Sequence, residues 1–177
     1  RELFAPVHPG FEALADLNEI DDLHDLAFYY DELLRALNLY RVAVVGHAFG
    51  ATIAAELAAH VPARVSRLAL VAPIRASGGG KHVADAFAAS PTRERGLRRR
   101  LRRITAPTLL VCDADDRAGA ADVAAEITDV TVEVLPGIGG LAEPEGLPVF
   151  LMCLERFLSD DVVEMTRAWG RQLDHTR

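Results

Sequence analysis

The sequence predicts an α/β fold of three layers, an α/β/α sandwich with a mainly parallel sheet. Short runs rich in Val and Leu alternate with segments of helical periodicity along most of the chain. Several of these runs are continuously apolar, which is typical of parallel strands buried on both faces. The 177 residues, 50% of them apolar, suit one domain. We expect a core over residues 1–158 and a polar tail over residues 159–177.

Each predicted strand is a short apolar run bounded by turn residues, and the helices are recognised by the spacing of their apolar side chains. The strands are expected at residues 3–5, 42–45, 68–71, 109–111 and 130–135. The runs 42–45, 68–71 and 109–111 are the ones expected to be buried on both faces. The first helix places one apolar face at Leu23, Leu26, Tyr30, Leu33, Leu34 and Leu37. Two further helices are expected at the alanine-rich residues 51–59 and at the amphipathic residues 149–158.

Residues 74–104 interrupt this alternation and are interpreted as a short insertion. Gly78, Gly79 and Gly80 favour a loop. Arginine then occupies seven of the eleven positions 93–103, while Leu97, Leu101 and Ile104 recur at helical spacing. The pattern favours a short helix with a solvated basic face over a binding patch for an anion or an acidic partner.

Composition excludes several classes of function. A formal net charge of -7 argues against nucleic acid as the main partner. Cys112 and Cys153 lie in apolar runs, which favours buried thiols, a reducing compartment and a cytoplasmic protein over a disulfide scaffold. No apolar run approaches the roughly 20 residues of a membrane span.

The segment over residues 42–50 carries the most chemical information. A buried strand leads into Gly46-His47-Ala48-Phe49-Gly50, and an alanine-rich helix follows. This is the layout of the nucleophile elbow, in which the central residue is normally a serine and glycines flank a tight turn. We expect glycine at both positions because a bulky side chain there would clash with the neighbouring backbone. Such a turn lifts the central side chain above the sheet, beside a helix N-terminus that favours developing negative charge.

At this turn the chain resembles the α/β-hydrolase superfamily, and three more segments resemble it in the family's order. Residues 4–11 look like the exit of the family's fourth strand, residues 110–117 like that of the seventh, and residues 135–144 like that of the eighth. The resemblance covers about residues 2–158. It implies that the family's N-terminal strands, one oxyanion loop and much of the lid are absent from this chain.

The catalytic positions implied by the resemblance depart from the family's triad. Ala48 stands at the nucleophile position and Gly140 at the histidine position, and only Asp116 keeps its triad residue. Losing either the nucleophile or the base costs about 10⁶ in kcat. Of the oxyanion donors, the Phe49 backbone N–H remains. We therefore do not expect hydrolysis by a serine triad.

Three functional hypotheses follow. The favoured one is a hydrolase-fold pseudoenzyme, a binding, regulatory or structural subunit for a protein partner or another copy; a small acyl or apolar ligand stays open. The second is a triad-independent lyase, cyclase or hydrolase with Asp116 as general base in an apolar pocket. The third is an ordinary ester hydrolase that has been inactivated or is represented only in part.

We expect neither a cofactor nor a metal. Asp113, Asp115 and Asp116 lack a matching fourth ligand and the spacing of an EF-hand. His47 is interpreted as a packing residue and Cys112 as a core residue.

Overall fold

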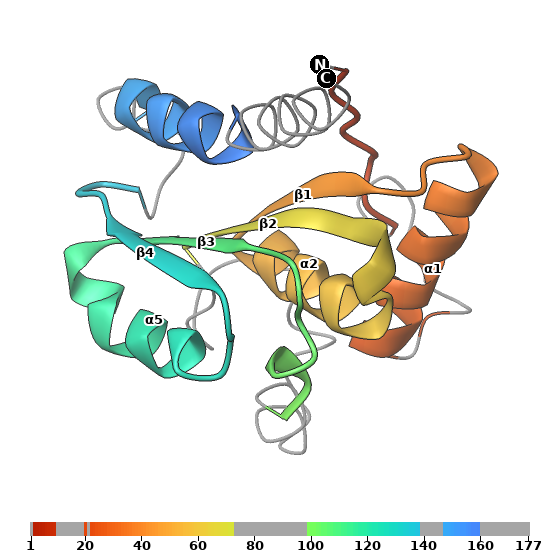
Figure 1. The fold of residues 1–177 in the computed structure, drawn as a ribbon, viewed down its shortest axis with the longest axis horizontal. Coiled ribbons are helices and arrows are strands. Elements are labelled where there is room, and N and C mark those ends of the chain that lie inside the picture. The colour runs from red at the N-terminus through yellow and green to blue at the C-terminus, as the bar shows by residue number, and fades with distance from the viewer. Residues whose placement is uncertain (1, 10–19, 21, 73–98, 139–146, 160–177) are drawn as a thin grey trace, which may run out of the picture.

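The computed structural model describes residues 2–9, 20, 22–72, 99–138 and 147–159. Their strands form one four-stranded sheet in the order β1-β2-β3-β4 (Figure 1). All three neighbouring pairs are parallel, so the carboxyl ends of the strands meet at one edge. The strand bounds are Val42–His47 for β1, Val65–Val71 for β2, Thr108–Cys112 for β3 and Val130–Val134 for β4.

Helices lie on both faces of this sheet, which confirms the α/β architecture (Figure 1). Helices α2 (Phe49–His60) and α5 (Arg117–Ala124) cover one face, and α1 (Leu23–Ala36) packs beside α2. A helix over residues 147–159 covers the other face. The short 3₁₀ turns η2 (Pro62–Arg64) and η3 (Ala114–Asp116) connect neighbouring elements.

The central strands are buried on both faces, as their continuous apolar runs predict. Alternate residues of β2 point to opposite sides of the sheet. Leu68 and Leu70 pack with the alanines of α2, whereas Ala69 and Val71 pack against the helix over residues 147–159. Both cysteines are buried, Cys112 completely.

The first strand of the sheet differs from this prediction. Val44 packs on the α2 side, but Val45 on the opposite face is 46% exposed. The helix over residues 147–159 packs on β2 and β3. Among the described residues, β1 is an edge strand with one face uncovered, so the expectation of two buried faces is wrong for residues 42–45.

The strand expected at residues 3–5 is also wrong, because residues 2–8 lie outside any helix or strand. A β-strand requires a hydrogen-bonded neighbouring strand, and in the described part of the chain none pairs with this segment. Its apolar side chains are instead exposed, Leu3 to 91% and Phe4 to 54%.

The predicted helices are confirmed. Asp22 caps α1 by accepting hydrogen bonds from the backbone of His24 and Asp25, and the Asp25 side chain accepts one from the Asp22 backbone. The predicted apolar face of the basic segment is confirmed at Leu101 and Ile104, both 2% exposed. Helical structure is described for residues 99–101 of that segment. None of the described helices is long and apolar enough to cross a membrane.

Several predicted features fall outside the described residues. These are the rest of the insertion with its glycine triplet, Gly140 and the tail from residue 160 onward.

Candidate functional site

The turn between β1 and α2 keeps the geometry of an elbow. Ala48 alone separates the two elements, with φ 51° and ψ -116°. Positive φ is costly for a residue with a Cβ atom, because that atom then crowds the backbone. The Ala48 N–H donates to the carbonyl of Val71 at 2.9 Å, and the Ala48 carbonyl accepts from the Ala51 N–H at 3.0 Å. The strained residue is therefore held in place from both β2 and α2.

The two elbow glycines are not equivalent. A Cβ atom on Gly46 would lie 2.3 Å from the carbonyl oxygen of Gly50, so that position requires glycine. A Cβ atom on Gly50 would meet no atom within 4 Å. The steric reason expected for both glycines thus holds for Gly46 and is wrong for Gly50, where space is open beside the first turn of α2.

Helix α2 has no side-chain cap at its start, and its polar residues recur at every fourth position. Ala48 provides no side-chain cap, so the helix begins without one of the usual acceptors for its first N–H groups. One turn later, Thr52 is 4% exposed, and among the described residues its hydroxyl has no hydrogen-bond partner. Residues 48, 52, 56 and 60 follow at intervals of four, so they share one face of the helix.

The exit of β3 is organised by Asp113. Its Oδ1 accepts from the Ala114 N–H at 2.6 Å, and its Oδ2 accepts from the Gly137 N–H at 2.9 Å. Asp113 thereby connects the loops that follow β3 and β4. The half-buried Asp116 lies at the start of α5 without capping that helix through its side chain. The pocket expected around Asp116 involves residues 74–92, which fall outside the described residues.

The thiol next to this loop, that of Cys112, is completely buried. Burial raises the pKa of Cys112, and the negative charges of Asp116 and Asp113 raise it further despite the opposing charge of Arg117. A thiol with a raised pKa stays protonated and is a poor nucleophile. The interpretation of Cys112 as a core residue is confirmed.

An imidazole and a phenol meet beside the elbow. Nδ1 of His8 lies 2.8 Å from the Tyr30 hydroxyl, and the His8 ring centroid is 5.7 Å from that of Phe49. Burial lowers the pKa of His8 and, together with the neighbouring Tyr29, raises that of Tyr30 to about 12. Both side chains are therefore neutral at pH 7. Their hydrogen bond attaches the segment before α1 to α1, and the ring contact with Phe49 brings the same segment beside the elbow.

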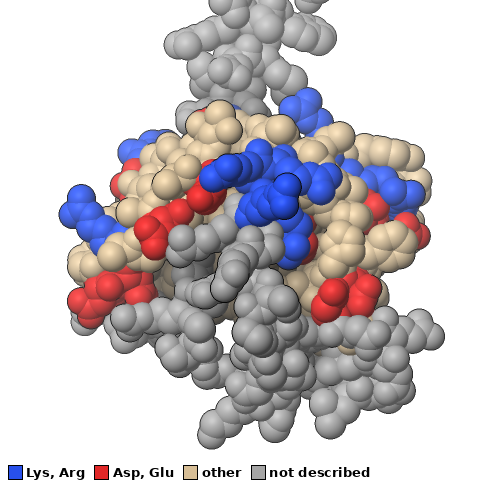
Figure 2. All heavy atoms as spheres, turned by 90° about the horizontal axis from the view of Figure 1, so that it is seen from below, with Lys and Arg blue, Asp and Glu red and all other residues tan. Residues whose placement is uncertain are grey.

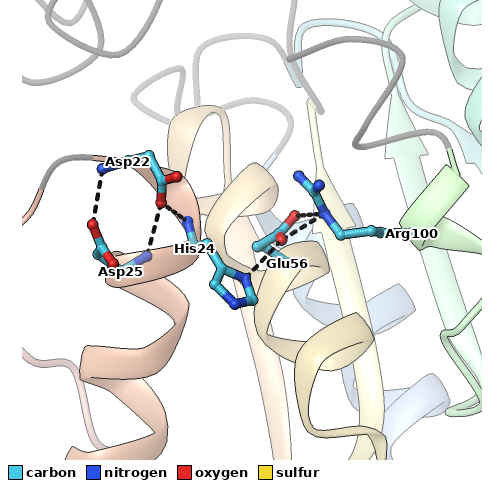
Figure 3. Close-up of polar contacts among 5 residues, drawn as sticks. All are labelled: Asp22, His24, Asp25, Glu56 and Arg100. Carbon is cyan, nitrogen blue, oxygen red and sulfur yellow. Dashed lines mark hydrogen bonds and ion pairs between the residues drawn. The ribbon is translucent and has the colours of Figure 1, made fainter. Parts of the chain in front are cut away.

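Further along α2, a buried carboxylate holds three segments together (Figure 3). Glu56 is fully buried, and its two oxygens lie 2.6 and 2.9 Å from Nε of Arg100. Nδ1 of His24, from α1, is 3.5 Å away. The close-up shows the His24 and Arg100 side chains converging on Glu56 from either side (Figure 3).

These contacts favour the structural interpretation of the arginine-rich segment. Arg100 binds Glu56, and Arg102 donates to Glu126 at 2.5 Å. The space-filling view shows basic side chains gathered on one face with acidic side chains close beside them (Figure 2). Two arginines of this segment therefore pair with acidic side chains of the same fold.

Within the described ranges, no group of three or more His, Cys, Asp or Glu side chains is arranged to hold a metal ion. An open hollow of about 460 Å³ is lined by Tyr40 and residues 61–64, next to the start of β2 and so at the end of the sheet opposite the elbow.

Known proteins share this fold. The family model described as alpha/beta hydrolase fold matches residues 12–95, just under half of the chain. The solved structure of a predicted CIB-like hydrolase from Thermoplasma acidophilum superposes with a TM-score of 0.62 at 19% identity, over 81% of this chain and 62% of that protein. The protein adopts the α/β-hydrolase fold. This chain spans less than two thirds of that hydrolase.

Two further solved structures with the α/β-hydrolase fold are similar. A serine-to-alanine mutant of the meta-cleavage product hydrolase CumD from Pseudomonas fluorescens IP01, complexed with acetates, has a TM-score of 0.63 at 13% identity, over 81% of this chain and 74% of that one. An enol-lactonase from Burkholderia xenovorans LB400 has a TM-score of 0.62 at 16% identity, over 78% and 73%. The comparison with curated proteins gives no match.

Within the α/β-hydrolase fold, the residues that sequence reasoning missed share one property. Thr52, Glu56, His8 and Asp113 acquire their surroundings from contacts made far along the chain. A signal was present in the sequence for two of them, because Thr52 and Glu56 are polar residues four apart in an alanine-rich helix. No local pattern distinguishes Asp113 from Asp115 and Asp116.

Proposed function

We propose that this α/β-hydrolase-fold protein does not hydrolyse substrates through a serine triad and instead acts as a binding subunit. The observation that carries the proposal is Ala48, a methyl group at the centre of a fully formed elbow. A methyl group has no lone pair to attack a carbonyl carbon. The elbow would then hold a ligand without forming an acyl-enzyme.

The size of the expected loss in kcat supports the absence of triad hydrolysis. Removing the nucleophile of a serine triad costs about 10⁶ in kcat, roughly 8 kcal/mol. Residual catalysis of about 10³ over water depends on an intact oxyanion hole. The Phe49 backbone N–H is the donor that the elbow itself provides. The resemblance implies that position 140 holds the base, and glycine there has no basic side chain. This also argues against hydrolysis by a serine triad.

The ligand class is proposed from the elbow and from a fold neighbour. A small acyl compound suits the N-terminus of α2, because N–H groups there favour oxygen atoms that carry negative charge. The Pseudomonas hydrolase, a serine-to-alanine mutant complexed with acetates, supports the same class. A protein partner, or a second copy of this chain, is the other proposed binding partner of this subunit.

The second candidate function is an enzyme that works without the triad. The observation that favours it is the His8–Tyr30 hydrogen bond, a pair of titratable groups beside the elbow. Two observations weigh against it. Nε2 of His8 is buried, and the raised pKa of Tyr30 keeps its phenol protonated. Asp116 remains the other candidate base.

Ester turnover tests the proposal. The wild-type protein is assayed with p-nitrophenyl esters of increasing acyl length, beside Asp116→Asn and Tyr30→Phe variants. We expect no saturable turnover in any of the three proteins. Saturable wild-type turnover that Asp116→Asn or Tyr30→Phe abolishes would overturn the binding function in favour of the triad-independent enzyme.

A further inference from the structure

The face of β1 opposite α2 is an apolar surface beside a covered one. Ala43 and Val45 lie on this face and are exposed, Val45 to 46%. Their Cα partners in β2 are Arg67 and Ala69. Paired residues of neighbouring strands point to the same side of a sheet. Ala43 and Val45 therefore belong to the sheet face that the helix over residues 147–159 covers on β2 and β3.

That helix ends beside the uncovered strand. In its last turns, the ring centroid of Phe157 lies 5.1 Å from the guanidinium carbon of Arg67. Because Arg67 is the β2 partner of Ala43, this end of the helix lies one strand away from β1. Residues 160–177 follow directly and would extend about 27 Å as a helix. The six residues of β1 extend about 20 Å, so the segment is long enough to cross the uncovered face.

The sequence of residues 160–177 suits such a face. Four apolar residues recur at intervals of three and four positions, which predicts an amphipathic helix with one apolar side. These residues are Val162, Met165, Trp169 and Leu173. Trp169 is the single tryptophan of the chain, and an indole ring buries a large apolar area when it packs.

We propose that residues 160–177 form an amphipathic helix whose apolar side packs on Ala43 and Val45 of β1, with Trp169 as the main anchor. This packing concerns the face of the sheet and does not depend on the ligand of the elbow. A segment of the same chain has an advantage over a separate partner, because a short tether gives it an effective concentration of about millimolar. Covering the face also removes apolar surface that would favour association between copies.

The fluorescence of Trp169 in the full chain tests this packing, because no other tryptophan contributes to it. We expect the folded protein to emit at shorter wavelength than the chain unfolded in urea, and acrylamide to quench it severalfold less. Val45→Ser makes the uncovered face more polar, so its emission should shift toward that of the unfolded chain. Val132→Ser is the matched control and should leave the emission unchanged. Val132 is 40% exposed on β4 and points to the same side as Val130, which packs on the side of α2 and α5.

A second pair of variants leaves the described strands and helices unaltered. Leu173→Ser changes the predicted apolar side of the segment, whereas Arg171→Ser changes its predicted polar side. We expect Leu173→Ser to make Trp169 more accessible to acrylamide and Arg171→Ser to leave the quenching as in the wild type. Because neither position lies in the described core, a loss of folding does not account for such a difference.

Three results would overturn the inference. If Trp169 emits in the folded protein as it does in urea, it is exposed and the face of β1 stays open to a separate partner. If the two variants of either pair change the emission equally, Trp169 packs elsewhere. If the short-wavelength emission is lost on dilution, a second copy of the chain provides the segment.

Discussion

The two halves of α2 differ in backbone strain and in how their buried polar groups are paired. At its N-terminal half the helix follows a residue with positive φ and lacks a side-chain cap. It also contains the Thr52 hydroxyl, which has no hydrogen-bond partner in the part of the chain that the structure describes. One turn further, the fully buried carboxylate of Glu56 accepts a hydrogen bond from Nε of Arg100 at Oε2, and the same nitrogen forms an ion pair with Oε1. The same helix therefore has a strained, uncapped N-terminus and, near its middle, a buried charge that is paired.

This difference fits the binding role that we propose for the elbow. Strained backbone and unpaired polar groups persist where they are useful, whereas paired buried charges contribute to holding the structure. The elbow belongs to the first kind and the Glu56 cluster to the second. Substitutions at the two places should consequently have opposite effects on stability.

The largest effect is expected at the Glu56 cluster. Arg100→Ala leaves a buried carboxylate with His24 alone, and removing one partner of a buried pair typically costs 3–5 kcal/mol. Because the Arg100 side chain is 36% exposed, we expect a loss of about 2–3 kcal/mol in urea unfolding. The exposed neighbour Arg99 is the control, and Arg99→Ala should change stability by less than about 0.5 kcal/mol. Equal effects at both positions would show that the cluster does not hold the fold.

A smaller effect of opposite sign is expected at the elbow. Ala48→Gly removes the Cβ atom from a residue with φ 51°, and we expect a gain of about 1 kcal/mol in stability. Ala58→Gly, in the buried interior of the same helix, should instead lose about 1 kcal/mol. Thermal unfolding of both variants measures the difference. A loss of stability in Ala48→Gly would contradict backbone strain at the elbow.

The smallest effect concerns pH. Burial lowers the pKa of His8, so the folded protein favours the neutral ring. As pH falls below the ordinary value of about 6.5, the unfolded chain takes up this proton first and stability declines until the folded pKa is passed. Above that range His8 has no effect on the pH dependence. Urea unfolding between pH 7.5 and 5 should therefore show a steeper loss for wild type than for His8→Gln, and parallel curves would contradict burial of the ring.

The sequence predicted the parts of the molecule that local patterns determine. The continuous apolar runs of β2 and β3 match strands buried on both faces, and the glycine at position 46 marks the elbow. Prediction failed where a distant partner decides the outcome. Residues 3–5 have the composition of a strand but no strand to pair with, and Val45 lies on an edge whose second face is uncovered among the described elements.

At the candidate site, too, local sequence patterns were informative and contacts between distant residues were not predictable. The alanine at position 48 could be recognised from its flanking residues, and its conformation is that of the expected turn. The roles of Asp113 and Thr52 could not. Asp113 accepts from Gly137, 24 residues further along the chain, and the burial of Thr52 depends on how α2 packs. The predicted part of Asp116 in catalysis stays a prediction.

The central claim is that the elbow binds without covalent chemistry, and a fluorophosphonate probe tests it most directly. Such a probe phosphonylates an activated hydroxyl nucleophile, and intact-mass measurement detects the adduct. We predict that the wild-type mass stays unchanged after incubation at pH 7.5. A stoichiometric adduct that a single substitution at Tyr30, Thr52 or Asp116 abolishes would contradict the account.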